Sequence, residues 1–356
     1  MWPDVRGGSL APFVVLLTIV GLIAEHPSSW SNDGSHTWRW ASPLQGAHAW
    51  WCKGHMLVAE IAAQTVQPST ASCVNNLVAA LSQAGPFPRV TDMVESACWA
   101  DDLKGDGLYV MGNWHFVDLV FNPTNYSPIV NPNYQDNVIS VLHSLQSSIL
   151  SASSAGENVN ATLGNVKRND RHRRRGRRYG LSADAHSQNP WELAFEVANV
   201  IHFFGDIHQP LHTTALFSAA FPAGDEGGNL FKVTVPAVPG LTELHEVWDS
   251  MCGTMTMDPV RPLNVSARLA LNNESAFLLA KYGSSVTPSA LGLNSTAMAA
   301  ESHALAVSVT YLNGTLQPHA TLTPSYLQSC LRTSERQIVV AGLRLAHFLD
   351  SAFAIT

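Results

Sequence analysis

Apolar residues recur at a helical spacing along much of the chain. One such stretch is Lys53 to Val66, where they lie three and four positions apart. The same period occupies Asn137 to Leu150, and it resumes after Asn189-Pro190, a pair typical of a helix start. The last stretch, Tyr326 to Phe353, is long and spaced for burial on one side. This pattern predicts amphipathic helices in all four places.

The pattern of a β-strand is confined to one stretch. Asn229 to Val235 (NLFKVTV) follows Gly227-Gly228 and predicts a short strand of a β-hairpin. Glu157 to Asn189 has no period and contains an Arg-rich run, so we predict an exposed loop there. We therefore expect an all-α protein, with one mainly helical domain from Trp50 to Thr356 and a short β-hairpin.

Residues 1–49 are predicted to be a signal segment with a possible propeptide. Ala11 to Ala24 is apolar, but it is shorter than the ~20 residues that span a membrane comfortably. Ala47-His48-Ala49, directly before Trp50, has the form of a cleavage signal, although it lies far from the apolar run. A second trimming step or a start Met elsewhere would explain that distance, and a retained signal anchor is the alternative.

Other features fit passage through the secretory pathway. The 5 Cys residues allow two disulfides and one spare thiol, with the pairing left open. Asn-x-Ser/Thr sequons, which accept N-linked glycans in secreted proteins, begin at Asn125, Asn160, Asn264, Asn273, Asn294 and Asn313. We expect a secreted or lumenal glycoprotein, extracellular or endolysosomal, that is a monomer without a stable membrane span after processing.

Composition and charge narrow the class of protein. Hydrophobic residues make up 46% and charged residues 13% of the 356 residues, as in globular proteins. Lys167 to Arg178 holds 8 of the 20 Lys and Arg residues, so the rest of the chain is strongly acidic. Such a surface repels polyanions, and binding one would require local positive charge such as metal ions. The 15 His against 5 Cys favour imidazole over thiolate metal ligands.

Two segments place imidazoles and carboxylates at one helical spacing. Ile201 to His212 (IHFFGDIHQPLH) contains His202 and Asp206, and Glu243 to Asp249 (ELHEVWD) contains His245. The spacing His-x-x-x-Asp puts both groups on one helix face, close enough to share a cation. A single pair of this kind is commonly a helix-surface contact, but two of them, with His212 beside one, favour a metal site.

Three upstream segments hold further candidates. They are Trp50 to His55 (WWCKGH), Ser96 to Asp102 (SACWADD) and Trp114 to Asp118 (WHFVD). Each has an ordinary structural explanation when taken alone, because a His beside aromatic residues is commonly a core residue.

Taken together, these segments resemble the class I zinc nucleases. The ordered set is Trp50…Gly54-His55, Trp99-Ala100-Asp101, His115-Phe116-Val117-Asp118, His202-x-x-x-Asp206 with His212, Gly227-Gly228-Asn229 and His245-x-x-x-Asp249. This family contains fungal single-strand-specific nucleases, plant bifunctional nucleases and trypanosomatid 3′-nucleotidase/nucleases. The stretch Trp50 to Ile61 is most similar to the trypanosomatid branch, and the resemblance extends to the last helix.

The resemblance implies the fold shared by zinc phospholipase C and class I nucleases, with three Zn²⁺ per chain. Asp206 would bridge two of the ions. The remaining ligands would be Asp101, His115 and His202 for the first zinc, His55 with the amine and carbonyl of an N-terminal Trp50 for the second, and His212, His245 and Asp249 for the third.

The resemblance also implies a reaction and a substrate. A zinc nuclease of this type hydrolyses phosphodiester bonds of single-stranded DNA and RNA to 5′-nucleotides and acts on 3′-nucleotides. Asp101 would orient the attacking water, and Lys104, where fungal members have Arg, would supply a catalytic cation. Phe116 and Asp118 would contact the base, and Asn229 would bind substrate. His208 matches no ligand position.

Two other functions remain open from the sequence. One is a zinc phospholipase C, whose third site tends to end in His-x-x-x-Glu rather than the His245-x-x-x-Asp249 found here. The other is a non-catalytic secreted glycoprotein that uses zinc only for folding. Structural zinc sites are usually closed by four protein ligands and favour Cys, whereas no Cys matches a ligand position here. The Arg-rich run is expected to be a solvated insertion, with substrate binding or proteolytic processing as alternatives.

Overall fold

The structure is a computed structural model that describes residues 50–83, 90–105, 107–130, 134–154, 190–255 and 257–354. The predicted signal segment and propeptide (residues 1–49) and the predicted Arg-rich loop (157–189) lie outside the described residues.

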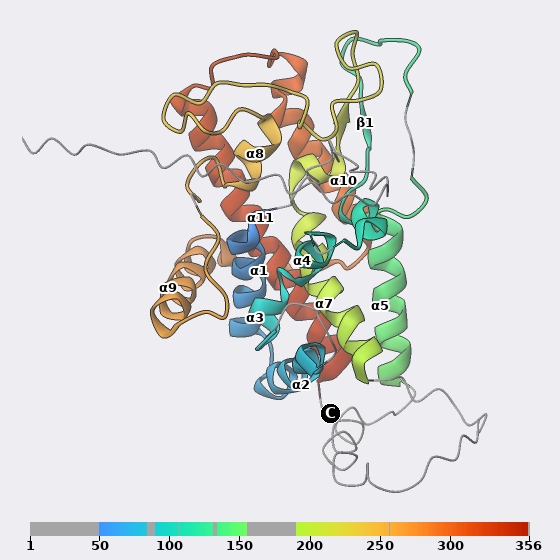
Figure 1. The fold of residues 1–356 in the computed structure, drawn as a ribbon, viewed down its shortest axis with the longest axis vertical. Helices are drawn as coiled ribbons and strands as arrows, with labels where there is room; N and C mark the ends of the chain where they lie inside the picture. The colour runs from blue at the N-terminus through green and yellow to red at the C-terminus, as the bar shows by residue number, and fades with distance from the viewer. Residues whose placement is uncertain are drawn as a thin grey trace, which may run out of the picture. The chain divides into compact units, whose positions relative to one another are not determined.

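The described chain is mainly helical, as predicted (Figure 1). The α-helices are α1 (Cys52–Thr65), α2 (Pro68–Val78), α3 (Met93–Ser96), α4 (Trp99–Gly105), α5 (Val138–Ser154), α7 (Pro190–Asp206), α8 (Leu244–Asp249), α9 (Val265–Tyr282), α10 (Ser295–Leu305) and α11 (Pro324–Phe353). Shorter helical turns are η1 (Ala79–Gln83), η2 (Tyr109–His115), η3 (Pro210–Thr213), η4 (Gly283–Ser285), η5 (Pro288–Leu291), η6 (Ala306–Thr310) and η7 (Leu312–Gly314).

The four helices predicted from apolar spacing correspond to α1, α5, α7 and α11. Helix α11 begins slightly before the predicted stretch, because Thr323 caps it by accepting the N–H of Tyr326 and Pro324 occupies its first turn. Proline is favoured there, since the first-turn N–H groups have no partner within the helix.

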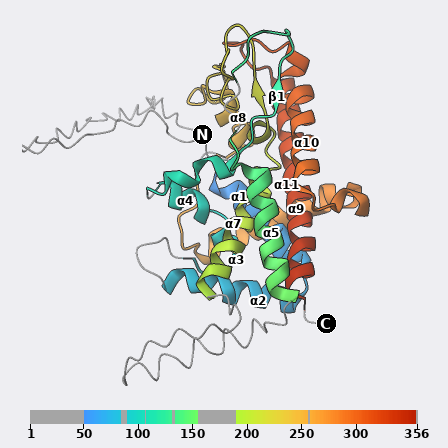
Figure 2. The same ribbon diagram turned by 90° about the vertical axis from the view of Figure 1, so that its right-hand side faces the viewer.

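Helix α11 forms the centre of the bundle. It packs against α1 and α7, and α5 lies beside α7 (Figures 1 and 2). The approach of α1 to α11 depends on Gly342, because a Cβ there would come within 2.6 Å of Ile61 and 2.9 Å of the Val58 carbonyl oxygen. This packing fixes the amino-terminal residues against the longest helix and so positions the start of α1.

The predicted β-hairpin is present only as an isolated antiparallel bridge. The two strands of the described residues, β1 (Val120–Phe121) and β2 (Ala215–Leu216), instead pair in parallel. Residues 229–235 make two isolated bridges, one antiparallel between Lys232 and Glu243 and one parallel between Thr234 and Thr321. Pro236 follows directly and has no N–H with which to continue a ladder.

Two disulfides and one free thiol are present, as the cysteine count predicted. Cys52–Cys98 joins the start of α1 to the residue before α4, and Cys252–Cys330 joins the loop after α8 to α11. Cys73 is free and buried. Among the described residues, no helix has both the length and the hydropathy that crossing a membrane requires.

Candidate metal centre

Six helical elements direct imidazoles and carboxylates into three adjoining buried groups. These groups are His55 with His202 and Asp206, Asp101 with His115 and His202, and His212 with His245 and Asp249. They come from α1, from the consecutive elements α4 and η2, from the consecutive elements α7 and η3, and from α8.

In one group, His115 and His202 face Asp101. The His115 Nδ1 and His202 Nε2 atoms lie 3.1 Å apart. The Asp101 Oδ1 atom lies 3.5 Å from the first nitrogen and 3.7 Å from the second. Both imidazoles are fully buried. Three donor atoms thus converge on one small volume.

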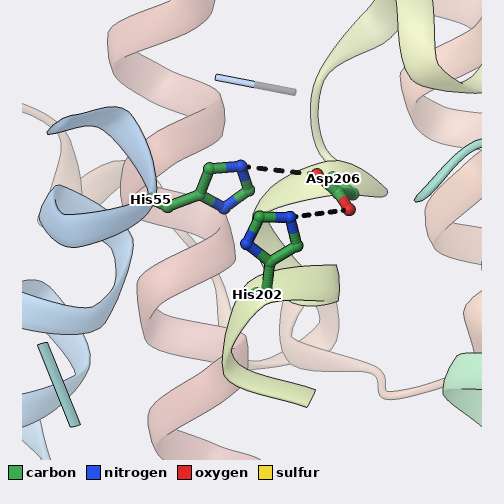
Figure 3. Close-up of side chains that lie close together, drawn as sticks. All are labelled: His55, His202 and Asp206. Carbon is green, nitrogen blue, oxygen red and sulfur yellow. Dashed lines mark ion pairs between the residues drawn. The ribbon is translucent and has the colours of Figure 1, made fainter. Parts of the chain in front are cut away.

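Asp206 connects this group to His55. Its Oδ1 atom lies 3.4 Å from His55 Nε2, and its Oδ2 atom lies 3.3 Å from His202 Nε2 (Figure 3). The Oδ2 atom also lies 3.0 Å from His115 Nδ1. One oxygen of this buried carboxylate therefore faces His55, and the other faces His115 and His202. This is the arrangement expected of a carboxylate that bridges two cations.

Two glycines make room for His55 and Trp50. The His55 ring stacks on that of His202 with centroids 3.8 Å apart, and a Cβ on Gly205 would come within 2.4 Å of His55 Nδ1. Trp50 is held next to them, because its indole Nε1 donates to the Gly205 carbonyl at 3.1 Å. A Cβ on Gly54 would come within 2.6 Å of the Trp50 Cβ. Small residues therefore allow Trp50 and His55 to reach the end of α7.

The third group lies where η3 meets α8. His212 Nε2 and His245 Nε2 lie 3.2 Å apart, and His245 Nε2 lies 3.0 Å from Asp249 Oδ2. Gly227 and Gly228, both with positive φ, form the turn beside it, and a Cβ on Gly227 would come within 2.6 Å of the Leu211 carbonyl oxygen. This explains the Gly-Gly pair that precedes Asn229.

The tautomers of these two imidazoles are those that could hold a cation between them. His212 Nδ1 donates to the His115 carbonyl at 2.8 Å and His245 Nδ1 to the Gly227 carbonyl at 2.7 Å. Since a carbonyl only accepts, each Nδ1 carries the proton, and a neutral ring then presents a lone pair at Nε2. Two lone pairs that face each other repel, unless a cation or a proton lies between them.

The separations fit a shared zinc ion. Two ligands at 2.0–2.1 Å from a tetrahedral zinc are about 3.3 Å apart, close to the 3.2 Å between His212 and His245 and the 3.1 Å between His115 and His202. In addition, both nitrogens of His55 and both oxygens of Asp206 are buried without a hydrogen-bond partner among the described residues. Buried polar atoms of this kind are costly unless an ion satisfies them.

The ionisation of His55 and His115 points the same way. Burial, with smaller contributions from His202 for His55 and from Lys104 for His115, lowers the pKa of His55 to about 3 and that of His115 to about 4. Neutral imidazole is the form that binds metals. Burial alone would also lower the pKa of His202, but the Asp206 and Asp101 carboxylates raise it to about 9. The acidic groups of the site therefore attract positive charge.

Lys104 lies at the edge of the centre. Its Nζ atom is 2.9 Å from Asp101 Oδ1, and the residue is buried. The predicted catalytic pair is thus brought together, one helical turn apart on α4.

Phe116 and Asp118 lie beside the third group. The N–H of Val117, between them, donates to the His212 carbonyl at 2.8 Å. Phe116 meets the ring of Tyr134 edge to face. Burial and the nearby charge of Glu226 raise the pKa of Asp118 to about 6.

Asn229 has a structural contact of its own. Its side-chain Nδ2 donates to the Glu226 carbonyl at 2.7 Å, within the turn that holds Gly227. Its predicted role in substrate binding stays a prediction.

Sequence reasoning missed Gln209. This fully buried residue donates from Nε2 to Asp249 Oδ1 at 2.6 Å and accepts the Leu211 N–H at Oε1. The hydrogen bond occupies one Asp249 oxygen and leaves the other facing His245. A polar residue in the apolar segment IHFFGDIHQPLH was the available signal, but its partner is 40 residues away.

His208 is not a ligand in this arrangement, in agreement with the sequence. Its Nδ1 donates to the Phe204 carbonyl at 2.7 Å, and its Nε2 accepts from Arg344 Nη1 at 2.8 Å. Both ring nitrogens are therefore engaged, and His208 fixes the turn between Asp206 and His212 to α11.

The fold and these groups define a mainly helical protein with a candidate polynuclear metal centre. The family model for the S1/P1 nucleases matches residues 50–354. The chain therefore belongs to the S1/P1 nuclease family.

Several relatives agree with this assignment. Endonuclease 4 of Arabidopsis thaliana is 27% identical over 87% of this chain and 91% of its own length. Nuclease P1 of Penicillium citrinum is 25% identical over 85% of this chain and 97% of its own. Endonuclease 3 of Arabidopsis thaliana is 34% identical over 43% of this chain and 49% of its own. The expected similarity to the trypanosomatid branch stays a prediction.

Proposed function

We propose that the protein is a secreted phosphoesterase that holds three Zn²⁺ and hydrolyses phosphodiester bonds of single-stranded DNA and RNA to 5′-nucleotides, with 3′-nucleotidase activity. Membership of the S1/P1 nuclease family supports a hydrolase that acts on nucleic acids. The observation that carries the proposal is Asp206, which faces His55 with one buried oxygen and both His115 and His202 with the other.

The donor atoms suit zinc. All of the side chains in the three groups are His or Asp, the borderline donors that zinc accepts, and none is Cys. The first zinc would be held by Asp101, His115, His202 and Asp206, the second by Asp206, His55 and the Trp50 amine and carbonyl, and the third by His212, His245 and Asp249. When bound, the ions would supply Lewis-acid polarisation of the phosphate and a lowered pKa for a coordinated water.

The chain's own residues would align the reaction. Asp101 would accept a hydrogen bond from the attacking water and orient it toward phosphorus. Lys104, 2.9 Å from Asp101, would place its ammonium against the charge that develops on the phosphoryl oxygens. A Lys offers one point charge rather than the bidentate fork of Arg, so it leaves the phosphate more freedom to turn.

Substrate selection would depend on Phe116 and Asp118. The half-buried Phe116 ring would stack on an unpaired base, and Asp118 would hydrogen-bond to the base edge. Stacking tolerates any base but requires that the base be exposed. This favours single strands over duplexes.

The second zinc would depend on proteolysis. Only a chain that begins at Trp50 has an amine there, so removal of residues 1–49 would create a ligand. The fold already holds the start of that chain in place, since the Trp51 N–H donates to the Asp249 carbonyl at 3.1 Å and Trp50 is fully buried. The two disulfides support folding in an oxidising compartment. We further propose a monomeric glycoprotein.

The proposal is tested by assaying the secreted protein on single-stranded RNA, duplex RNA, a 3′-nucleotide and lecithin. We expect nucleotides from the single strand and phosphate from the 3′-nucleotide, both abolished by chelation and restored by zinc. Release of phosphocholine from lecithin without nucleotide release would contradict the proposal and favour a phospholipase C. Hydrolysis that survives complete zinc removal would also contradict it.

A further inference from the structure

Helix α9 presents a row of large apolar side chains to solvent. Val265, Leu269 and Phe277 are 87%, 59% and 61% exposed. With Asn273, which is also exposed, they follow one another at intervals of four residues and so lie along one side of the helix. Exposed apolar side chains in a contiguous arrangement usually have a partner or a cover.

The helix is not free to turn this row inward. Its opposite side is buried through Leu271, Ser275 and Leu278. There the Ser275 hydroxyl accepts from Gln64 Nε2 at 2.7 Å, and Asn272 Nδ2 donates to Glu60 Oε1 at 2.8 Å. Both views show α9 at the edge of the bundle (Figures 1 and 2). The exposed row therefore belongs to the folded state.

Two of the six sequons of the chain lie on this helix. Asn264-Val265-Ser266 begins directly before the row, and Asn273-Glu274-Ser275 places its asparagine within the row, between Leu269 and Phe277. Asn264 caps α9 through Oδ1, which accepts the Ala267 N–H. A glycan is attached at Nδ2, so capping and modification are compatible.

We propose that N-linked glycans on Asn264 and Asn273 cover the apolar row of α9. The inference rests on the proposed passage through the secretory pathway. Carbohydrate is bulky and solubilising. A glycan that grows from the middle of the row separates its apolar side chains from other molecules, and it prevents the row from serving as a contact with a second copy or a lipid surface.

The modification is a group transfer from a lipid-linked oligosaccharide pyrophosphate. A bond forms between the asparagine Nδ2 and the anomeric carbon of the sugar. The bond from that carbon to the pyrophosphate oxygen breaks, and the amide proton leaves with the released lipid pyrophosphate. The transfer acts on the sequon in the unfolded chain, so the later burial of Ser275 does not prevent it.

The test compares two variants secreted from eukaryotic cells. In the first, Ser266→Ala and Asn273→Gln remove both α9 sequons while leaving the Asn264 cap and the buried Ser275 hydroxyl in place. In the matched control, Thr296→Ala removes the sequon at Asn294, where an exposed Thr is replaced and the Asn294 cap of α10 is kept. Peptide mass spectrometry before and after enzymatic deglycosylation measures occupancy, and sedimentation and binding of an apolar dye measure exposure of the row.

We expect glycan mass on both α9 asparagines of the wild-type protein. The double variant should shift toward larger sedimenting species and bind more dye, whereas Thr296→Ala should match the wild type. Bare Asn264 and Asn273 beside a modified Asn294 would overturn this inference alone, as would a double variant that sediments and binds dye like the wild type. If every sequon were unmodified, the proposed secretion would fall together with it, while the proposed hydrolase would still be judged by its own assay.

Discussion

Lys104 is the residue through which the proposed catalysis can be separated from metal binding. It lies against Asp101 but offers an ammonium, which is not a metal ligand. Replacing Lys104 by Met should lower kcat by about 10²-fold, the usual loss when one group that stabilises transition-state charge is removed. Lys104→Arg should retain more activity than Lys104→Met, because it keeps the charge. The measurement is kcat on a 3′-nucleotide with the zinc content checked in parallel, and an unchanged kcat in Lys104→Met would exclude the proposed role.

Asp118 gives a prediction for stability against pH. Its pKa in the folded protein is about 6, above the ordinary 3.8, so the folded chain binds more protons than the unfolded chain between these values. The contribution of this carboxyl to the free energy of unfolding therefore falls as the pH rises through that window. Asp118→Asn has no carboxyl to titrate, so its free energy of unfolding lacks this fall with rising pH.

Thermal unfolding at about pH 5 and about pH 7 measures the effect of Asp118. The advantage of Asp118→Asn over the wild type should be larger at the higher pH, where the wild-type carboxyl is charged. Because each comparison is made at one pH, other titrating groups cancel. A difference in Tm that is equal at both pH values would show that the carboxyl titrates normally.

Gln209 tests whether the neighbours of the ligands shape the third zinc site. Loss of its hydrogen bond to Asp249 leaves that carboxylate free to turn, and removal of such a neighbour typically weakens metal affinity 10–100-fold. Gln209→Met should therefore release one zinc to a chelator before the others. Gln337→Met is the matched control, because Gln337 is also buried but donates to the His208 carbonyl and to Ser302. Equal zinc release from both variants would contradict the role of Gln209.

At the scale of elements, the end of α7 is where helix packing and the metal centre meet. Gly205 gives space to the His55 ring of α1, and its carbonyl accepts the Trp50 indole. Gly205→Ala improves the intrinsic helix propensity of α7 by up to about 1 kcal/mol, yet its Cβ would clash with His55. We expect the second zinc to be lost although the helix remains. Gly112→Ala, whose Cβ would meet nothing within 4 Å, should keep the wild-type zinc content.

Helices α1, α5, α7 and α11 could be predicted from the sequence, because their amphipathic period is a local signal. The β1–β2 pair was missed, since each strand has two residues and the partners are far apart in the chain. The predicted strand at 229–235 is reduced to isolated bridges, and its partners, Glu243 and Thr321, are set by the fold rather than by a local pattern.

The candidate site could likewise be predicted only where its signal is local in the sequence. Pairs such as His202 with Asp206 follow from helical spacing, but their convergence with His55 and His115 depends on packing, and only the family resemblance anticipated it. The carbonyls that set the tautomers of His212 and His245, and the amide of Gln209, are invisible in a sequence. They depend on backbone groups and contacts brought together by the folded chain.

At the scale of the whole molecule, the candidate metal centre would compensate for the acidic charge of the chain. Away from the Arg-rich stretch the sequence carries few basic residues, so bound cations would supply the positive charge that attracts a polyanion. Proteolytic maturation would also control metal binding, because the amine of Trp50 would become available only after cleavage.

Native mass spectrometry of the secreted, deglycosylated protein is the most direct test of the proposed zinc centre and its Trp50 ligand. One spectrum gives both the start of the chain and the number of bound metal ions. We expect a chain that begins at Trp50 and carries three zinc ions, one for each group of His and Asp side chains. An active protein that holds no zinc would contradict the metal centre itself. A chain that begins upstream of Trp50 and still carries three zinc ions would contradict the role of the Trp50 amine.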